Sequence, residues 1–174
     1  MIIDIFIIQG DFLRIKTRGV LRKSDKNKLL KELEEIFGSD IISPYTNSKF
    51  ETVVTDRFSL IYVDGKQMFM EYENTYFPTV RGALLLNPDC RKVVVDSGAV
   101  KFVVNGADIM SPGIVKADSD IEPGDLVIIV EEQHNKTLAI GKAILSGPEM
   151  ESSDKGKAVN SLSYVGDSIW DIVL

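Results

Sequence analysis

The first 75 residues combine strand-like and helix-like hydrophobic patterns. Apolar residues dominate 2–16 and predict an extended segment with a turn or bulge at Gly10-Asp11. Ser24 is suited to cap a helix and Gly38 to end it, and the residues between them that recur at helical spacing are Leu29, Leu30, Leu33, Ile36 and Phe37. The strands predicted after this helix are 50–55, 58–63 and 67–72, with a hairpin turn at Asp64-Gly65. This pattern indicates an α+β domain over residues 1–75.

From about residue 76 the pattern changes to short strands separated by turn signals. Pro78 suits the first turn of a short helix over 79–86, and a second short helix over 97–104 ends at Asn105-Gly106. The strands predicted here are 91–95, 109–115, 126–130 and 137–145, the last two joined by a polar hairpin. Short strands at this spacing indicate a small β-barrel over residues 76–174. The predicted fold class is therefore α+β, with a mainly-β second domain.

Composition and cysteine content indicate the cellular compartment in which the protein is expected. The 174-residue chain is 44% hydrophobic and 26% charged, as globular proteins are, and it has no apolar run of about 18 residues that would cross a membrane. Asp4 interrupts the apolar start, which we interpret as a strand and not as a signal peptide. A single cysteine, Cys90, excludes an internal disulfide and fits a reducing compartment. We therefore expect a cytoplasmic protein with no membrane partner.

Charge is distributed unevenly along the chain. The net charge is −6, yet residues 14–31 hold eight basic residues against one acidic residue, a net of +7. A concentrated basic segment attracts phosphate even in an acidic protein, because salt screens charges beyond about 8–10 Å. We expect RNA contacts at Lys23, Lys26 and Lys28 on the predicted helix. The alternative is a solvated helix face that binds nothing.

The segment from Val95 to Val115 carries the most specific motif of the chain. It has Gly-Ala at the start of the short predicted helix, Gly-Ala near its end and Pro-Gly in the next strand, as Gly98-Ala99, Gly106-Ala107 and Pro112-Gly113. Pro123-Gly124-Asp125 and Ala139–Ala143 follow in the same order. Together these motifs resemble the PUA domain, the RNA-binding barrel named after pseudouridine synthase and archaeosine transglycosylase.

The glycines of this motif have a physical interpretation of their own. Gly98 and Gly106 bracket a short helix, where the backbone turns sharply and a positive φ is favourable for glycine. Glycine also lets a phosphate approach backbone N–H groups, and the start of a helix supplies such donors. The alternative is that these glycines merely build the barrel.

Other segments extend the resemblance to nearly the whole chain. Phe77–Arg81, Tyr164–Trp170 and Ile15-Lys16-Thr17 ahead of a basic helix are similar to the malignant-T-cell-amplified-sequence family, which has archaeal and eukaryotic members. The resemblance implies a pre-PUA domain over 1–75 and a PUA domain over 76–174. It also implies a non-enzymatic role with tRNA or on the small ribosomal subunit, in translation re-initiation or recycling and usually with a protein partner.

One departure from an RNA-binding composition is the charge of the second domain. Residues 76–174 hold nine basic and fourteen acidic residues, which lowers the expected affinity of this half for RNA phosphates.

The resemblance also implies particular RNA contacts. In PUA domains the contact surface surrounds the short helix, the loop after it and nearby strand ends, which here correspond to Gly98, Ala99, Lys101, Asn105, Gly106, Ala107 and Met110. Lys155 and Lys157 precede the last strand, where a basic side chain would meet a phosphate. The residues expected to face inward from the short helix are Val100, Val103 and Val104. Two alternatives stay open: Lys101 is only the exposed side of that helix, and Met110 belongs to the core.

The sequence shows no arrangement for catalysis. His134 is a lone histidine in a polar hairpin and Cys90 a lone cysteine, so no nucleophile–base pair is indicated. Phosphate-binding loop motifs are absent, and one Cys with one His excludes a Cys/His zinc site. We expect no catalytic residue, no cofactor and no metal ion.

Two other functions remain open at this stage. One is the accessory RNA-recognition subunit of an RNA-modifying complex whose catalytic domain lies on another chain. The other is a protein–protein adaptor on the ribosome, docked through the acidic second domain or through exposed aromatic residues of the first, Phe69, Tyr76 and Phe77. The dependence of binding on salt distinguishes RNA binding from the adaptor role. RNA binding through the lysine segment weakens steeply between about 50 and 200 mM salt, whereas apolar docking does not.

Overall fold

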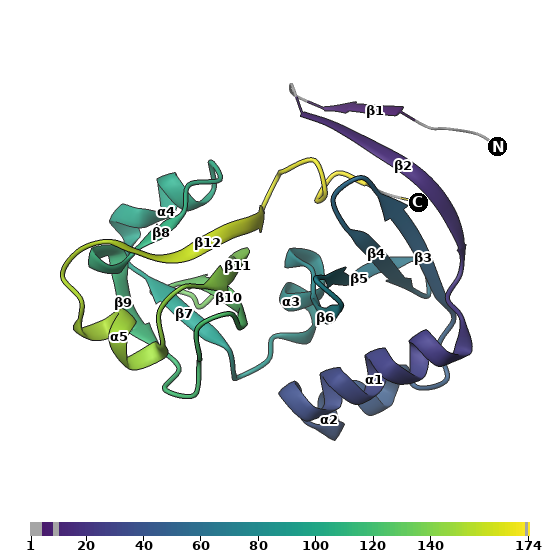
Figure 1. Cartoon of the computed structure of the whole chain (residues 1–174), viewed down its shortest axis with the longest axis horizontal. Helices are drawn as coiled ribbons and strands as arrows, with labels where there is room; N and C mark the ends of the chain where they lie inside the picture. The colour runs from purple at the N-terminus through teal and green to yellow at the C-terminus, as the bar shows by residue number, and fades with distance from the viewer. Residues whose placement is uncertain (1–4, 9–10, 173) are drawn as a thin grey trace. The chain divides into compact units, whose positions relative to one another are not determined.

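The chain folds into two compact units in the computed structural model (Figure 1), which describes residues 5–8, 11–172 and 174. The first unit comprises Met1–Pro88 together with Asp171–Leu174, and the second comprises Asp89–Trp170. The first unit thus extends beyond the boundary expected at residue 75 and also includes the C-terminal end. Among the described residues, no helix is long and apolar enough to cross a membrane.

The first unit is built on a six-stranded antiparallel sheet in which strands neighbour one another in chain order. Its strands are β1 (Ile5–Ile8), β2 (Asp11–Val20), β3 (Phe50–Thr55), β4 (Ser59–Val63), β5 (Lys66–Tyr72) and β6 (Thr75–Pro78). Its helices are α1 (Lys23–Phe37), α2 (Ser39–Ile42), the 3₁₀-helix η1 (Ser43–Tyr45) and α3 (Val80–Leu86). The extended segment expected over 2–16 is present, where it is described, as the paired strands β1 and β2; residues 2–4 and 9–10, which include Gly10 of the predicted turn or bulge, lie outside the described residues.

Helix α1 forms because its apolar residues fall on one face. Leu29, Leu33 and Phe37 are buried, and the Phe37 ring lies 5.5 Å from that of Phe77. Gly38 ends the helix with a φ of 88°, as predicted, and donates its N–H to the Glu34 carbonyl. The predicted cap at Ser24 is wrong. The N-cap position is held by Arg22, two residues earlier, without a side-chain cap, and the Ser24 hydroxyl donates to the Asp25 carboxylate.

The β4–β5 turn follows the prediction. Asp64 and Gly65 both have positive φ, 49° and 79°, which suits the Asp-Gly pair in a two-residue hairpin. The Asp64 carboxylate accepts a hydrogen bond from the Lys49 backbone N–H, and this bond lowers the pKa of Asp64 below its ordinary value. The Asp64 N–H also donates to the Lys49 carbonyl at 2.9 Å, so the turn is tied to the residue that precedes β3.

Helix α3 packs on β5 because residue 82 has no side chain. A Cβ atom on Gly82 would lie only 1.7 Å from the Met68 carbonyl oxygen, so glycine alone permits this approach. Thr79 caps the helix through its hydroxyl, which accepts from the Gly82 N–H. The assignment of Pro78 to the first helical turn is wrong, since Pro78 ends strand β6. As a residue of an edge strand it removes no central sheet hydrogen bond.

The C-terminal end completes the first unit. The buried Tyr62 hydroxyl donates to the Ile172 carbonyl at 3.0 Å, and the Gln67 amide lies 3.4 Å from the same oxygen. Burial raises the pKa of Tyr62, so the hydroxyl stays protonated and remains a donor. Residues of the β4–β5 hairpin and of the C-terminal end therefore share one buried hydrogen-bonded cluster.

The second unit is a mainly-β pseudo-barrel, which confirms the predicted α+β fold class. Its strands are β7 (Lys92–Val95), β8 (Ile109–Met110), β9 (Ile114–Ala117), β10 (Leu126–Glu131), β11 (Thr137–Ala143) and β12 (Lys157–Tyr164), in the order β8-β12-β11-β10-β7-β9. β7 and β10 are parallel and the other pairs antiparallel. One core joins the sheet to α4 (Ser97–Val103) and α5 (Gly147–Ser152) through Val103 and Met150.

Loops of the second unit are held by carboxylates. At least nine of its thirteen acidic residues accept hydrogen bonds from backbone N–H groups: Asp96, Asp108, Asp118, Asp125, Glu131, Glu132, Glu149, Glu151 and Asp167. At α5, Ser146 and Glu149 form a reciprocal capping box that the sequence analysis did not anticipate. The backbone N–H and hydroxyl of Ser146 lower the pKa of the Glu149 carboxyl.

The C-terminal cluster leads to a stability prediction. Tyr62→Phe removes the donor to the Ile172 carbonyl without changing the ring, and we expect a loss of about 1 kcal/mol in the free energy of unfolding. Urea denaturation measures the difference, and Tyr45→Phe, a hydroxyl deletion in the same unit outside this cluster, is the control. Equal stability of Tyr62→Phe and wild type would show that the contact contributes nothing.

The carboxylate contacts predict how stability depends on pH. Carboxyl pKa values lowered in the folded state contribute stability that is present above the unfolded value, about 4, and is lost as pH falls through the folded values. The urea midpoint should therefore decrease as pH is lowered from about 5 to 3, and less steeply in Glu149→Gln. A midpoint that is constant or rises on acidification would contradict this interpretation.

Candidate nucleic-acid interface

A groove of about 710 Å³ lies in the second unit. It is lined by α4, the segment from Ala107 through β8, the 3₁₀-helix η2 (Ser111–Gly113) and the first residue of β12. The lining residues are Asp96, Gly98, Ala99, Phe102, Val103, Ala107, Asp108, Ile109, Met110, Pro112, Gly113 and Lys157. The groove thus lies at the motif that the sequence analysis identified.

Five of the predicted contact residues meet in this groove: Gly98, Ala99, Ala107, Met110 and Lys157. Lys101, Asn105 and Gly106 belong to or directly follow α4 but do not line it, and Lys155 lies in the turn before β12. Lys23, Lys26 and Lys28 belong to the first unit. That any of these residues touches RNA remains a prediction.

The groove presents an unusually apolar surface to solvent. Met110 is 48% exposed, so the alternative that placed it in the core is wrong. Phe102 is 58% exposed, and the Lys101 ammonium lies 4.9 Å from the centre of its ring. The sequence analysis missed Phe102. Its signal was present, because Phe102 is the aromatic residue of α4 that the inward-facing valines leave on the outer side.

Among the described residues that line the groove, Lys157 is the basic one, and it is paired. Its ammonium lies 2.6 Å from Asp108 Oδ2, while Asp108 Oδ1 accepts from the Ser161 N–H at 2.8 Å. The hydrogen bond from Lys157 and, secondarily, that from Ser161 lower the pKa of the Asp108 carboxyl. Asp108 is therefore ionised at neutral pH.

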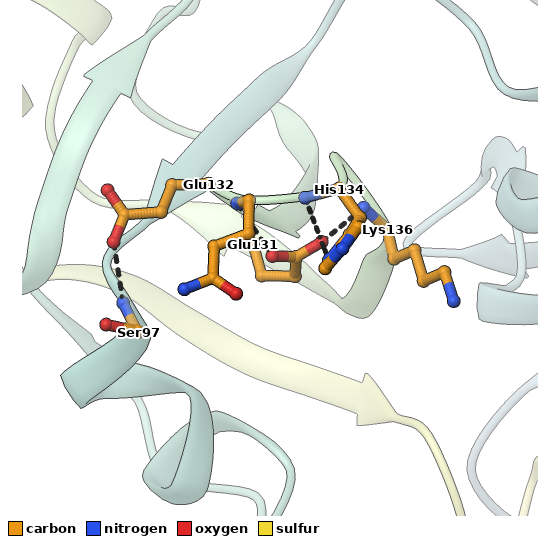
Figure 2. A network of polar contacts seen from close by, with 6 residues as sticks. Ser97, Glu131, Glu132, His134 and Lys136 are labelled. Carbon is orange, nitrogen blue, oxygen red and sulfur yellow. Dashed lines mark hydrogen bonds and ion pairs between the residues drawn. The ribbon is translucent and has the colours of Figure 1, made fainter.

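Carboxylates already occupy the start of α4. Asp96 Oδ1 accepts from the Ala99 N–H at 2.8 Å. Glu132 Oε1 accepts from the Ser97 N–H at 3.0 Å, as Figure 2 shows. Glu132 reaches this position from the β10–β11 hairpin, which Glu131 closes by accepting from three backbone N–H groups, as Figure 2 shows in part. The Ser97 and Ala99 N–H groups belong to the helix start that we expected to bind a phosphate, but both are already bonded to carboxylates of the protein.

The two bracketing glycines differ. Gly106 has a φ of 84°, and a Cβ atom there would lie 2.6 Å from Cε1 of Tyr164, so its role in the loop is structural. Gly98 is not among the residues with positive φ, and a Cβ there would lie 3.2 Å from Asp96 Oδ1. Only Gly106 therefore requires the conformational freedom that we expected of both.

The lysines of α1 are largely engaged within the first unit. Lys26 donates to the Ser48 carbonyl at 2.9 Å and lies over the Phe50 ring, while Lys28 donates to the Asn74 carbonyl at 3.1 Å. Lys23 lies in the first turn with its side chain exposed. A phosphate that binds Lys26 or Lys28 would have to replace these contacts within the first unit, whereas the Lys23 side chain is exposed.

Chemically reactive residues have unreactive surroundings. Burial, together with Asp118 and Asp120, raises the pKa of the Cys90 thiol, which keeps it protonated and a poor nucleophile. His134 is exposed and lies 3.7 Å from Glu131 Oε1. Within the described residues, no group of three or more His, Cys, Asp and Glu side chains is arranged to hold a metal ion.

The aromatic docking surface considered for the first unit is wrong. Phe69, Tyr76 and Phe77 are only 1%, 3% and 1% exposed. Period-two alternation did not reveal this, because β4 and β5 bury consecutive residues and therefore have both faces covered.

Comparisons with known proteins agree with the motif. The PUA domain model matches residues 91–165, within the second unit. The chain is 43% identical over 160 residues to an uncharacterized protein of Methanocaldococcus jannaschii, covering 91% of this chain and 98% of the relative. It is 29% identical over 167 residues to translation machinery-associated protein 20 of Saccharomyces cerevisiae, covering 91% of each.

Two further similarities extend the comparison. Malignant T-cell-amplified sequence 1-B of Xenopus laevis is 28% identical over 119 residues, 66% of each chain. The crystal structure of a hypothetical protein of Pyrococcus horikoshii superposes with a TM-score of 0.84 at 35% identity, covering 91% of this chain and all of that one. The chain therefore belongs to the family of PUA-domain proteins that includes translation machinery-associated protein 20 and the malignant-T-cell-amplified-sequence proteins, as an archaeal-type member.

Proposed function

We propose that this protein is a non-catalytic RNA-binding protein of translation that binds tRNA or small-subunit ribosomal RNA in the cytoplasm. The observation that carries the proposal is the groove of the second unit, where exposed apolar side chains and a lysine meet inside the segment that matches the PUA domain. The names of the relatives, among them translation machinery-associated protein 20, support the assignment to translation.

The groove has the two components that RNA binding requires. Phe102 and Met110 offer exposed apolar surface on which an unpaired base can stack, a contact that tolerates any base. Lys157 lies at the same groove and offers an ammonium for a neighbouring phosphate. Because carboxylates occupy the N–H groups of Ser97 and Ala99 at the start of α4, we assign the phosphate contact chiefly to this side chain.

The basic segment supplies attraction at longer range. Several of its side chains are exposed on β2 and at the start of α1: Arg14, Lys16, Arg18, Arg22 and Lys23. Arg18 lies 3.6 Å from Glu51, and Lys28 lies 3.6 Å from Glu32, so these positive charges are partly compensated. We therefore assign the electrostatic attraction chiefly to Arg14, Lys16, Arg22 and Lys23.

The decisive experiment is a filter-binding titration against the host's bulk tRNA and small ribosomal subunits at about 50 and 200 mM salt. Binding that weakens steeply with salt supports the proposal, and the tighter target distinguishes tRNA handling from ribosome docking. Absence of binding to both targets at low salt would refute it.

Phe102→Ala tests the apolar part of the groove. Loss of a stacked base should weaken RNA binding by about 1–3 kcal/mol, or roughly 5- to 150-fold, with little effect on folding because the ring is exposed. The matched control is Val115→Ala, which truncates a 53% exposed apolar side chain of the same unit outside the groove. Equal affinities of the two variants would remove Phe102 from the interface.

Reversing Lys23 tests the basic segment. Lys23→Glu should weaken RNA binding and flatten its dependence on salt, since each lysine–phosphate contact contributes roughly 0.7–0.9 to the logarithmic slope. Lys26→Glu is a less informative change, because it also breaks the contacts with Ser48 and Phe50. Lys66→Glu, which reverses an exposed lysine on β5 of the same unit, serves as the control. An unchanged slope in Lys23→Glu would place the attraction elsewhere.

A further inference from the structure

The groove contains a carboxylate in the position where a phosphate would bind. Three charged side chains line it, Asp96, Asp108 and Lys157, so its own charge is net negative. Asp96 is committed to the Ala99 N–H, whereas Asp108 holds the ammonium of Lys157 at 2.6 Å. An RNA phosphate that approaches Lys157 must therefore compete with a carboxylate that is already bound to it.

The two carboxylate oxygens of Asp108 contact different groups. Oδ1 accepts the Ser161 N–H at 2.8 Å and so ties the segment before β8 to β12. Strands β8 and β12 are also joined by backbone pairing, of Met110 with Lys157 and of Ile109 with Val159. Oδ2 faces Lys157 alone. The strands therefore remain held together if the ammonium leaves, because neither the Ser161 contact nor the backbone pairing depends on it.

The pair is sufficiently exposed to be exchanged. The side chains of Lys157 and Asp108 are 45% and 34% exposed. Water and salt screen an ion pair at this level of exposure, so its net contribution is small and a second anion can replace the carboxylate. A buried pair would resist such an exchange, because one charge would be left without a partner.

We propose that Asp108 is a positioning residue that holds Lys157 at the groove and competes with RNA phosphate for it. In the free protein the carboxylate neutralises the ammonium, so a phosphate gains little from electrostatic attraction alone. A phosphate whose adjoining base is seated on the apolar wall is held beside Lys157 and displaces the carboxylate. The pair thereby lowers the affinity for RNA that does not fit the groove. This inference rests on the proposed function, since it concerns the same groove.

Asp108→Asn tests the competition. The amide oxygen still accepts the Ser161 N–H, but the charge that holds Lys157 is removed. Affinity for bulk tRNA should increase about two- to five-fold, as expected for release of an exposed ion pair, with a steeper salt dependence. Asp120→Asn removes one negative charge from an exposed residue of the same unit outside the groove, and it should change affinity less.

The dependence on Lys157 separates competition from a general charge effect. In a Lys157→Ala background, Asp108→Asn should no longer increase affinity, because no ammonium remains to be released. An equal increase in both backgrounds would overturn the proposal. Weaker binding of Asp108→Asn than of wild type would also overturn the competition, because it would show that the carboxylate favours RNA binding, either by positioning Lys157 or by contacting RNA directly.

Folding and the proposed function are checked separately. Thermal unfolding shows whether Asp108→Asn retains the native state, and Asp108→Ser, whose short side chain also removes the charge, is the second variant. Loss of the folded state in both would identify the carboxylate as a structural clamp and refute the competition. If wild type itself binds neither tRNA nor small subunits, the proposed function fails. If wild type binds and Asp108→Asn binds equally, only the competition fails.

Discussion

The second unit depends on carboxylates that accept hydrogen bonds from loop backbone. A small barrel has many turns, and each turn leaves N–H groups that no strand or helix partner satisfies. Here these donors are taken by aspartate and glutamate side chains, with Glu131 alone accepting from three in one hairpin. The acidic charge of this unit is therefore largely a consequence of how its loops are held. It does not by itself indicate a surface for a basic partner.

The same contacts shape the groove. Asp96 and Glu132 take two of the N–H groups that the start of α4 would otherwise offer to an anion. In the proposed RNA interface, the contacts therefore fall mainly to side chains, namely Phe102 on the outer surface of α4, the exposed Met110 and the ammonium of Lys157. A site of this kind depends more on fit to an unpaired base than on phosphate attraction. This is physically consistent with an RNA-binding unit that carries net negative charge.

Sequence reasoning succeeded where a local constraint decides the structure. The helical spacing of the apolar residues in α1, the Asp64-Gly65 turn and the positive φ of Gly106 each follow from a few neighbouring residues. It failed where distant segments decide. The burial of Phe69 requires that both faces of the sheet are covered, and the bond between Tyr62 and Ile172 joins residues far apart in the sequence. The wrong cap at Ser24 shows a further limit of sequence reasoning, because the first residue of the helix depends on where the preceding strand, β2, ends.

Charge illustrates the same limit for the candidate site. Counting residues identified the basic segment correctly, but a count does not distinguish a lysine that packs from one that is available. Lys26 lies over the Phe50 ring and donates to a backbone carbonyl, so its charge contributes to the fold of the first unit, whereas Lys23 is exposed. Lys157 is intermediate, since it is paired with Asp108 yet almost half exposed. In the proposed function, the affinity for RNA therefore depends on the free energy of releasing each lysine from its present partner. A net charge obtained by counting residues does not include this free energy.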